Sequence, residues 1–191
     1  MPPTEPLAEY ERKRDFTKTS EPRGRGRKSG SLFVIQKHAA TALHYDFRLE
    51  SDGVLLSWAV PKGPSTDPRD KRLAMRVEDH PVSYADFEGV IPKGEYGGGQ
   101  VIVWDMGTYR PLEDVPMAEQ LRKGHVKVWL EGQKVRGGYS LRRWGKDKRG
   151  REKWLLVKID DETADRRRNP TSTQPESVLT GRTIEDLKRE P

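Results

Sequence analysis

The sequence lacks cysteine altogether and contains few apolar residues. Without cysteine, the chain cannot form disulfides, thiolate metal sites, iron–sulfur clusters or a cysteine nucleophile, so a bound metal must use His, Asp or Glu. Apolar residues make up 32% of the 191 residues, below the roughly 45–50% of typical globular chains. No apolar run approaches the roughly 20 residues that cross a bilayer, and no apolar segment of a secretory signal follows the N-terminus. These absences predict a soluble intracellular protein.

Charged residues, by contrast, reach 35% of the chain, and the basic ones are unevenly placed. Net charge is −2 over residues 31–100 and +6 over residues 101–160. A basic surface beside an acidic site indicates a polyanionic partner, although a solvated hairpin tip would show the same pattern. The residues predicted to contact nucleic acid are Arg142, Arg143, Lys146, Lys148, Arg149 and Arg151.

Composition divides the chain into three regions. Residues 1–30 are basic and rich in proline and glycine, which predicts a partly extended arm. Residues 31–160 hold the strands of a folded domain. Residues 161–191 are polar and predict a flexible tail with a short helix at 183–189.

Eight short runs of β-branched and aromatic residues predict strands within the middle region. The runs are 32–36, 43–50, 54–60, 72–78, 100–105, 126–131, 139–144 and 154–159. Asp52-Gly53 predicts a tight hairpin turn, and a helix is expected at 114–123, with Asp114 as its cap and Gly124 as its end. The pattern predicts a mainly β fold, a closed eight-stranded barrel with one or two flanking short helices and flexible N- and C-terminal segments.

The stretch from His38 to Leu49 contains the most informative group of candidate metal-binding and catalytic residues. Because side chains alternate along a strand, His44, Asp46 and Arg48 share one face, which is expected on the solvent side. His44 and Asp46 can bind one divalent ion, and His38 can return to it from the preceding turn, which leaves coordination positions open for catalysis. Arg48 lies one strand step further and can grip a metal-bound anion. The plainer alternative is a surface pair on an amphipathic strand.

A third histidine, His80, precedes Pro81, which restricts it to an extended conformation. It can serve as a metal ligand, a general acid or a phosphate donor, and spacing does not choose among these roles. Tyr84 can add a hydroxyl donor or pack as a core aromatic. A stiff turn presents Lys62, whereas the glycine-rich loop 91–99 lacks P-loop spacing and is expected to turn the backbone or approach the barrel closely.

These residues resemble a known family. The similarity extends from about Tyr10 to Asp160, includes Arg14-Asp15-Phe16 and Glu21, and points to the 3′-phosphoesterase domain of bacterial DNA ligase D. That domain also occurs as a stand-alone protein, and a stand-alone form without polymerase or ligase modules is expected here. The segments that carry the resemblance are FVIQKH at 33–38, LHYDFRL at 43–49, WAVPKGP at 58–64, VEDHP at 77–81 and IPKGEYG at 91–97.

The resemblance implies a fold and an activity. The family fold is an eight-stranded barrel with flanking helices. Its members are manganese-dependent hydrolases that remove a 3′-terminal ribonucleoside by phosphodiester cleavage and then the 3′-phosphate, leaving a 3′-OH for ligation. Zn²⁺ or another divalent transition metal is also expected to bind the isolated protein, because divalent-ion affinities favour zinc and copper.

The resemblance also implies partners and a location. The substrate would be a DNA primer–template with a 3′-ribonucleotide or 3′-phosphate end. Ku and a DNA ligase would act in trans in non-homologous end joining, and no membrane is involved. The expected location is the prokaryotic cytoplasm, associated with the nucleoid through DNA.

Family site residues carry over by position. The metal ligands map onto His38, His44 and Asp46. In the expected mechanism Arg48, with Lys62 or Arg72, neutralises charge developing on the phosphoryl group. His80 either protonates the leaving oxygen or stabilises the transition state. The full set of other matching active-site positions is His80, Arg48, Tyr84, Lys62, Arg72, Glu78, Gln36, Arg14, Asp15 and Glu21.

Two alternatives come from other functional classes. His44, Asp46 and His80 imitate the 2-His-1-carboxylate triad of non-haem Fe(II) oxygenases, which leaves Arg48 and the basic region unexplained. A non-catalytic β-barrel could instead bind single strands with a basic groove and stacking aromatics. The aromatics considered for that role are Trp129, Trp144 and Trp154.

Overall fold

The computed structural model describes residues 7–23 and 30–190. In those two stretches no helix is both long and apolar enough to span a membrane. Most of the basic run 23–30, expected in the N-terminal arm, lies outside the described residues. The helices are α1 (Ala8–Arg12), α2 (Met117–Lys123), α3 (Pro170–Thr173) and α4 (Ile184–Arg189), with one 3₁₀ turn, η1 (Val82–Asp86).

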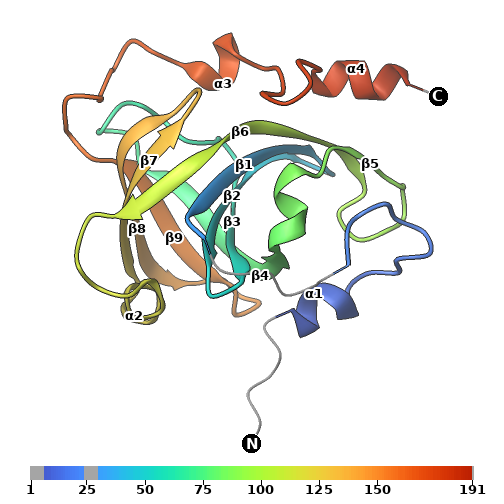
Figure 1. Cartoon of the computed structure of the whole chain (residues 1–191), viewed down its shortest axis with the longest axis horizontal. Helices are drawn as coiled ribbons and strands as arrows, with labels where there is room; N and C mark the ends of the chain where they lie inside the picture. Colours follow the sequence, from blue (N-terminus) through green and yellow to red (C-terminus); the bar gives the residue numbers. More distant parts are fainter. Residues whose placement is uncertain (1–6, 24–29, 191) are drawn as a thin grey trace, which may run out of the picture.

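Antiparallel strands form one sheet that closes on itself (Figure 1). The ring runs in the order β1-β2-β3-β4-β9-β8-β7-β6, and β6 pairs with β1 to complete it. β5 (Gly89–Ile91) pairs with the beginning of β6 outside the ring. The mainly β fold and the closed eight-stranded barrel are therefore confirmed. The ring strands are β1 (Leu32–Ala39), β2 (Leu43–Ser51), β3 (Val54–Val60), β4 (Arg72–Pro81), β6 (Gly99–Pro111), β7 (His125–Gly132), β8 (Arg136–Lys146) and β9 (Glu152–Lys158).

Two local predictions can be compared directly with the backbone. Asp52 and Gly53 both have positive φ, at 51° and 80°, as the predicted tight turn between β2 and β3 requires. Helix α2 ends at Gly124 in the left-handed conformation, as expected. It begins only after Pro116, however, because the extended ψ of Pro116, 141°, keeps the preceding residues, including Asp114, out of the helix.

Side-chain alternation gives the barrel an apolar interior and a partly covered exterior. A second apolar cluster lies outside the ring, where α1, η1 and β5 pack against the outer surface of β1, β3 and β6. Polar side chains on this part of the outer surface are consequently buried rather than exposed to solvent. The largest fully buried interior side chains are Trp58, Trp104, Trp154, Tyr139, Phe33 and Phe47. The outer cluster includes Tyr10, Val34, Leu55, Tyr84 and Phe87.

The C-terminal segment runs along the outside of the barrel, and Figure 1 shows α3 and α4 beside β6. Helix α4 begins with a capping box at Thr183 and buries Ile184 and Leu187 against Ile102 of β6. Trp104 donates its indole N–H to the carbonyl of Gln174 at 2.7 Å. The division into an arm, a barrel domain and a tail stays a prediction.

Candidate metal centre and active site

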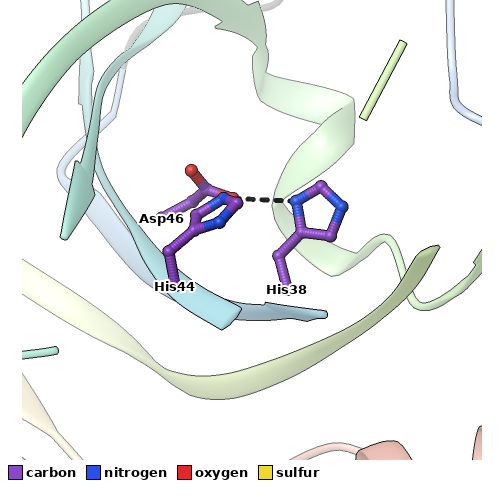
Figure 2. Close-up of side chains that lie close together, drawn as sticks. All are labelled: His38, His44 and Asp46. Carbon is purple, nitrogen blue, oxygen red and sulfur yellow. Dashed lines mark hydrogen bonds and ion pairs between the residues drawn. The ribbon is translucent and has the colours of Figure 1, made fainter. Parts of the chain in front are cut away.

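Two histidines and one aspartate meet where β1 and β2 pair. His38 lies directly opposite His44 in the register, and Asp46 follows two residues along β2 on the same face. The Oδ2 atom of Asp46 is 3.2 Å from Nε2 of His44 and 3.5 Å from Nδ1 of His38, and Figure 2 shows both rings beside this carboxylate. One donor atom from each residue lies within 4.8 Å of the others, the spacing that a single metal ion requires.

Backbone carbonyls fix the orientation of both rings. His38 donates from Nε2 to the carbonyl of Gly97 at 2.6 Å, and His44 donates from Nδ1 to the carbonyl of Ala42 at 3.1 Å. Because a carbonyl can only accept, these nitrogens carry the protons. The other nitrogens, Nδ1 of His38 and Nε2 of His44, are the ones turned toward Asp46. Such outer contacts set the tautomer of metal-binding histidines.

The glycine-rich loop explains why Gly97 stands next to His38. Gly97 adopts φ of 72°, and a Cβ atom there would lie 3.3 Å from Cε1 of His38. A side chain at this position would therefore be strained and would press on the ring. The expected close approach of this loop to the barrel brings its backbone to the first histidine.

The charges of His44 and Asp46 are coupled. Burial alone would lower the pKa of His44, but the Asp46 carboxylate outweighs it and raises that pKa. Burial would raise the pKa of Asp46, yet the charges of His44 and Arg48 hold it well below its usual range. Asp46 is thus a carboxylate at neutral pH, and a proton on Nε2 of His44 would occupy the position of a metal.

Arg48 brings a buried guanidinium to the same face. It is 3% exposed, and it donates from Nε to Gln36 and from Nη1 to Ser57, both at 2.8 Å. Its Nη2 atom lies 3.7 Å from Oδ2 of Asp46. Two hydrogen bonds therefore hold the guanidinium beside the cluster of His38, His44 and Asp46, with Nη2 facing Asp46.

His80 lies on β4 and contacts Arg14 from the N-terminal segment. The guanidinium Nη2 of Arg14 is 3.2 Å from Nε2 of His80, and Nδ1 of His80 is 2.9 Å from the carbonyl of Glu78. Since arginine only donates, Nε2 accepts and Nδ1 carries the proton. Burial lowers the pKa of His80 well below its usual range, and the Arg48 and Arg14 cations lower it further. His80 is therefore a neutral imidazole near pH 7.

This arrangement argues against the oxygenase alternative. A facial triad would need the lone pair of His80 beside His44 and Asp46, but that lone pair accepts from a cation. Over residues 7–23 and 30–190, the group of His, Asp and Glu donors close enough to share an ion is the one that contains His38.

The N-terminal segment closes one side of the site. Arg14 pairs with Glu21 at 2.9 Å and Glu78 at 3.4 Å. Tyr84 donates its hydroxyl to Glu21 at 2.8 Å. Burial and the Glu21 carboxylate raise the pKa of Tyr84 well above its usual value, so the phenol keeps its proton. Tyr84 thus combines a buried aromatic ring with a hydroxyl contact, the two roles left open by the sequence.

One cavity of about 240 Å³ joins most of the predicted residues. Gln36 and Glu21 lie behind its wall and bond to Arg48, Arg14 and Tyr84. The predicted residues that line the cavity are Arg14, His38, His44, Asp46, Arg48, Glu78, His80 and Tyr84.

Three other predicted active-site residues lie neither in this cavity nor behind its wall. Lys62 and Arg72 line a separate depression at the ends of β3 and β4, together with Arg69 and Lys71. Asp15 is exposed and accepts hydrogen bonds from Thr17.

The predicted nucleic-acid contacts belong to the β8–β9 hairpin. Arg143 pairs with Glu152 at 3.2 Å, and Arg151 pairs with Asp147 at 2.7 Å. Exposed basic residues of this hairpin without an ion pair to any described residue are Arg142, Lys146, Lys148 and Arg149.

Several contributors were missed by sequence reasoning. Tyr10 is fully buried, and its ring lies 4.1 Å from the guanidinium carbon of Arg14 and 5.0 Å from the ring of His80. Tyr96 is 47% exposed at the rim of the cavity, where Lys13 lies over its ring. In the sequence, Ser57 has no feature that distinguishes it from other strand residues, yet it accepts a hydrogen bond from Arg48. These roles depend on contacts between distant segments, and no spacing within one segment signals them.

Comparisons with known proteins point to the same part of the chain. The family model described as the DNA Ligase D 3′-phosphoesterase domain matches residues 36–143. A multifunctional non-homologous end joining protein LigD from Pseudomonas aeruginosa is 52% identical over 191 residues, covering 96% of this chain and 22% of that protein. The LigD protein of Mycobacterium tuberculosis H37Rv is 44% identical over 166 residues, covering 84% of this chain and 21% of that protein. The chain thus spans about a fifth of the length of these relatives.

Proposed function

The chain belongs to the DNA ligase D 3′-phosphoesterase family, and from this premise we propose that it heals DNA 3′ ends in a metal-dependent reaction. It removes a 3′-terminal ribonucleoside as a phosphodiesterase and then removes the 3′-phosphate, leaving a 3′-OH. The observation that supports this proposal most is the pairing of a metal-ligand cluster with the buried guanidinium of Arg48 in one cavity. A cation site beside a fixed positive charge suits a phosphate group.

Mn²⁺ is the proposed cofactor, held by His38, His44 and Asp46. The fit rests on three donor atoms within 4.8 Å and on the carbonyls of Ala42 and Gly97, which turn one free nitrogen of each ring toward the carboxylate. Two nitrogens and one carboxylate oxygen suit a divalent transition ion, and Zn²⁺ would compete by affinity. A bound ion would polarise a phosphate oxygen and lower the pKa of a water molecule.

Arg48 is proposed to bind the scissile phosphate. Gln36 and Ser57 hold its guanidinium in place before substrate arrives, so little reorganisation is needed when charge develops on the phosphoryl oxygens. Lys62 and Arg72, in their separate depression, are proposed to contact phosphates further along the strand.

His80 is proposed to position Arg14 rather than to protonate the leaving oxygen. A neutral ring that donates from Nδ1 to Glu78 and accepts from Arg14 at Nε2 has no proton left to give. The same contact orients Arg14 at the cavity wall, where its charge stabilises a negatively charged transition state. This favours the second of the two roles expected for His80.

DNA with a 3′-ribonucleotide or 3′-phosphate end is the proposed substrate. Ku and a DNA ligase are the proposed partners in trans, since the similar proteins are named for non-homologous end joining.

The decisive experiment is incubation with Mn²⁺ and a primer–template whose primer ends in one ribonucleotide. The primer should be shortened to a 3′-phosphate and then to a 3′-OH, with no product when the metal is chelated. Salt-dependent DNA binding without turnover in Mn²⁺, Zn²⁺ or Co²⁺ would overturn the proposal and favour the single-strand-binding barrel. Trp154, one of the aromatics considered for that barrel, is fully buried and cannot stack on a base.

A further inference from the structure

Trp144 is an exposed tryptophan that the proposed reaction does not use. Its side chain is 54% exposed, and Nζ of Lys153 lies 4.0 Å from the centre of its ring. The ammonium group covers one part of the ring and leaves much of the rest open to solvent. An exposed indole beside a cation is a typical platform for an aromatic ligand that carries negative charge nearby.

A β-bulge places Trp144 on the outer surface. Arg143 pairs with Trp154 and Gly145 pairs with Lys153, so Trp144 is one extra residue on β8. Arg143 lies over the buried ring of Trp154, on the inner side. The bulge therefore turns the next side chain away from the interior, as bulges commonly do beside binding sites.

The strand register connects Trp144 with the cluster of His38, His44 and Asp46. Asp46 lies opposite Ala59 on β3, Ala59 opposite Met75 on β4, and Met75 opposite Lys153 on β9. Directly opposite residues of antiparallel strands point to the same side of a sheet. One continuous row across the outer surface therefore runs from the metal cluster to Lys153 and its neighbour Trp144.

The row is open along its length. Ala59, Met75 and Lys153 are all partly exposed, and Ala59 also lines the cavity that holds the cluster. Four strand-to-strand steps of about 4.8 Å separate β2 from β8, which gives a path of roughly 19 Å along the surface. With a rise of about 3.4 Å per stacked nucleotide, this path corresponds to about six nucleotides.

The charge of the neighbouring hairpin favours nucleic acid over protein as the ligand that occupies this row. Residues 142–153 hold seven basic residues against two acidic ones, and both acidic residues are already paired within the hairpin. The phosphates of a nucleic acid that lies along this hairpin can pair with the cations that have no acidic partner among the described residues. Its bases can then contact the indole of Trp144.

We infer that Trp144 and Lys153 form a stacking site for an unpaired nucleobase on the strand opposite the reacting 3′ end. This inference rests on the proposed function, because DNA is taken as the substrate. Bases of the primer are paired, and a base inside a duplex has no free face for an indole. The unpaired template beyond the primer end supplies bases with free faces about six nucleotides from the metal cluster.

The test compares Trp144→Ala with the wild type on two DNAs that share the recessed 3′ end. One has a template extension longer than about six nucleotides and the other an extension of about two. Binding is measured by anisotropy of labelled DNA in EDTA, so that no turnover occurs. On the long extension the variant should lose about 5- to 100-fold in affinity, the range for one base–aromatic stack. On the short extension it should match the wild type, and Trp144→Phe should retain most of the affinity.

Trp129→Ala is the matched control. Trp129 is also a partly exposed tryptophan between cations, with Arg110 and Arg136 at 5.4 and 5.6 Å, but it lies on β7, away from the row. Equal loss in both alanine variants, or unchanged binding of Trp144→Ala to the long extension, would overturn the inference. Failure of the proposed function would show separately, as absence of wild-type turnover with any metal.

Discussion

Asp46 faces three groups that can carry positive charge. Its Oδ2 atom lies 3.5 Å from His38, 3.2 Å from His44 and 3.7 Å from Arg48. Without a metal, Arg48 balances the charge of the carboxylate, and His44 does so as well whenever it is protonated. With a metal, the ion would replace the His44 proton, so metal binding and protonation compete at this residue.

The first prediction follows from that competition. Because the pKa of His44 is raised above its ordinary value near 6.5, Mn²⁺ affinity should fall as pH drops through this raised pKa, on the order of tenfold per pH unit below it. His44→Ala should bind no Mn²⁺ at the centre and show no turnover, while its circular dichroism spectrum stays that of the wild type. Isothermal titration with Mn²⁺ between pH 5 and 8 measures both effects.

His125→Ala serves as the control for the metal experiment. His125 lies on β7 and contacts Ser140, far from the cluster in the strand order. Its variant should retain metal affinity and turnover. A His44→Ala protein with near-normal Mn²⁺-dependent activity would refute the ligand assignment.

The second prediction separates phosphate binding from metal binding at Arg48. Arg48 cannot ligate a metal, because a guanidinium has no free lone pair. Arg48→Ala should therefore bind Mn²⁺ at least as well as the wild type, since a nearby cation has been removed. Its turnover should fall on the order of a hundred- to a thousand-fold, equivalent to ~3–4 kcal/mol. Arg48→Lys should recover little, because an ammonium cannot bond to Gln36 and Ser57 and also reach a phosphate.

Metal titration and turnover on the same Arg48→Ala sample decide between two roles. If Arg48 mainly holds the centre together through Asp46, metal affinity and thermal stability should fall together with activity. Such a joint loss would count against a phosphate-binding role.

At the scale of elements, alternation in one strand predicted much of the centre. Period two alone places His44, Asp46 and Arg48 on one face of β2. The expectation that this face meets solvent was wrong, because η1 and the N-terminal segment cover it and leave Arg48 buried. The covering segments are joined by contacts between residues about 60 positions apart, such as the hydrogen bond from Tyr84 to Glu21, and no local sequence pattern encodes such contacts. Strand register could not be predicted from one strand either, because it depends on how two strands pair.

The third prediction concerns the junction between β9 and the C-terminal segment. Asp161 accepts from Lys158 at 2.7 Å and from the backbone of Gly138 and Thr163, both at 2.9 Å. The Lys158 side chain is fully buried. Asp161→Asn leaves this cation without its carboxylate, and loss of one partner of a buried pair costs about 3 kcal/mol of unfolding free energy. Urea unfolding at pH 7 measures the loss.

The direction of the Asp161 pKa shift fixes how the contribution of Asp161 to stability depends on pH. Burial alone would raise the pKa of Asp161, but Lys158, Thr163 and the Gly138 N–H lower it well below its usual value. Its contribution is therefore complete above the unfolded-state pKa near 3.9 and is lost as pH falls through the folded-state pKa. The gap between Asp161→Asn and the wild type should shrink in acid. Asp160→Asn, an exposed neighbour, should change stability by less than about 0.5 kcal/mol.

At the scale of the whole molecule, charge is arranged along one path. The cavity holds carboxylates that are each paired with a cation, Asp46 with Arg48 and Glu78 with Arg14. The β8–β9 hairpin adds exposed cations that have no acidic partner among the described residues. In the proposed function, this arrangement would attract a polyanion to the hairpin by long-range charge, and specific contacts at the centre would then position it.

The last prediction tests that arrangement through salt dependence. Lys148→Gln with Arg149→Gln removes two unpaired cations at the hairpin tip, so DNA should bind more weakly and with a shallower dependence on salt. The slope of log affinity against log salt should fall by up to about 1.8, or about 0.9 for each lost phosphate contact. The matched control is Lys188→Gln with Arg189→Gln, which removes the same charge from exposed positions on α4, beside β6. If both double variants change the slope equally, the attraction reflects net charge alone. If neither changes it, the hairpin is a solvated surface and the DNA lies elsewhere. A change confined to Lys148 and Arg149 would place DNA phosphates on the hairpin, because counterion release counts only the phosphates that a protein neutralises.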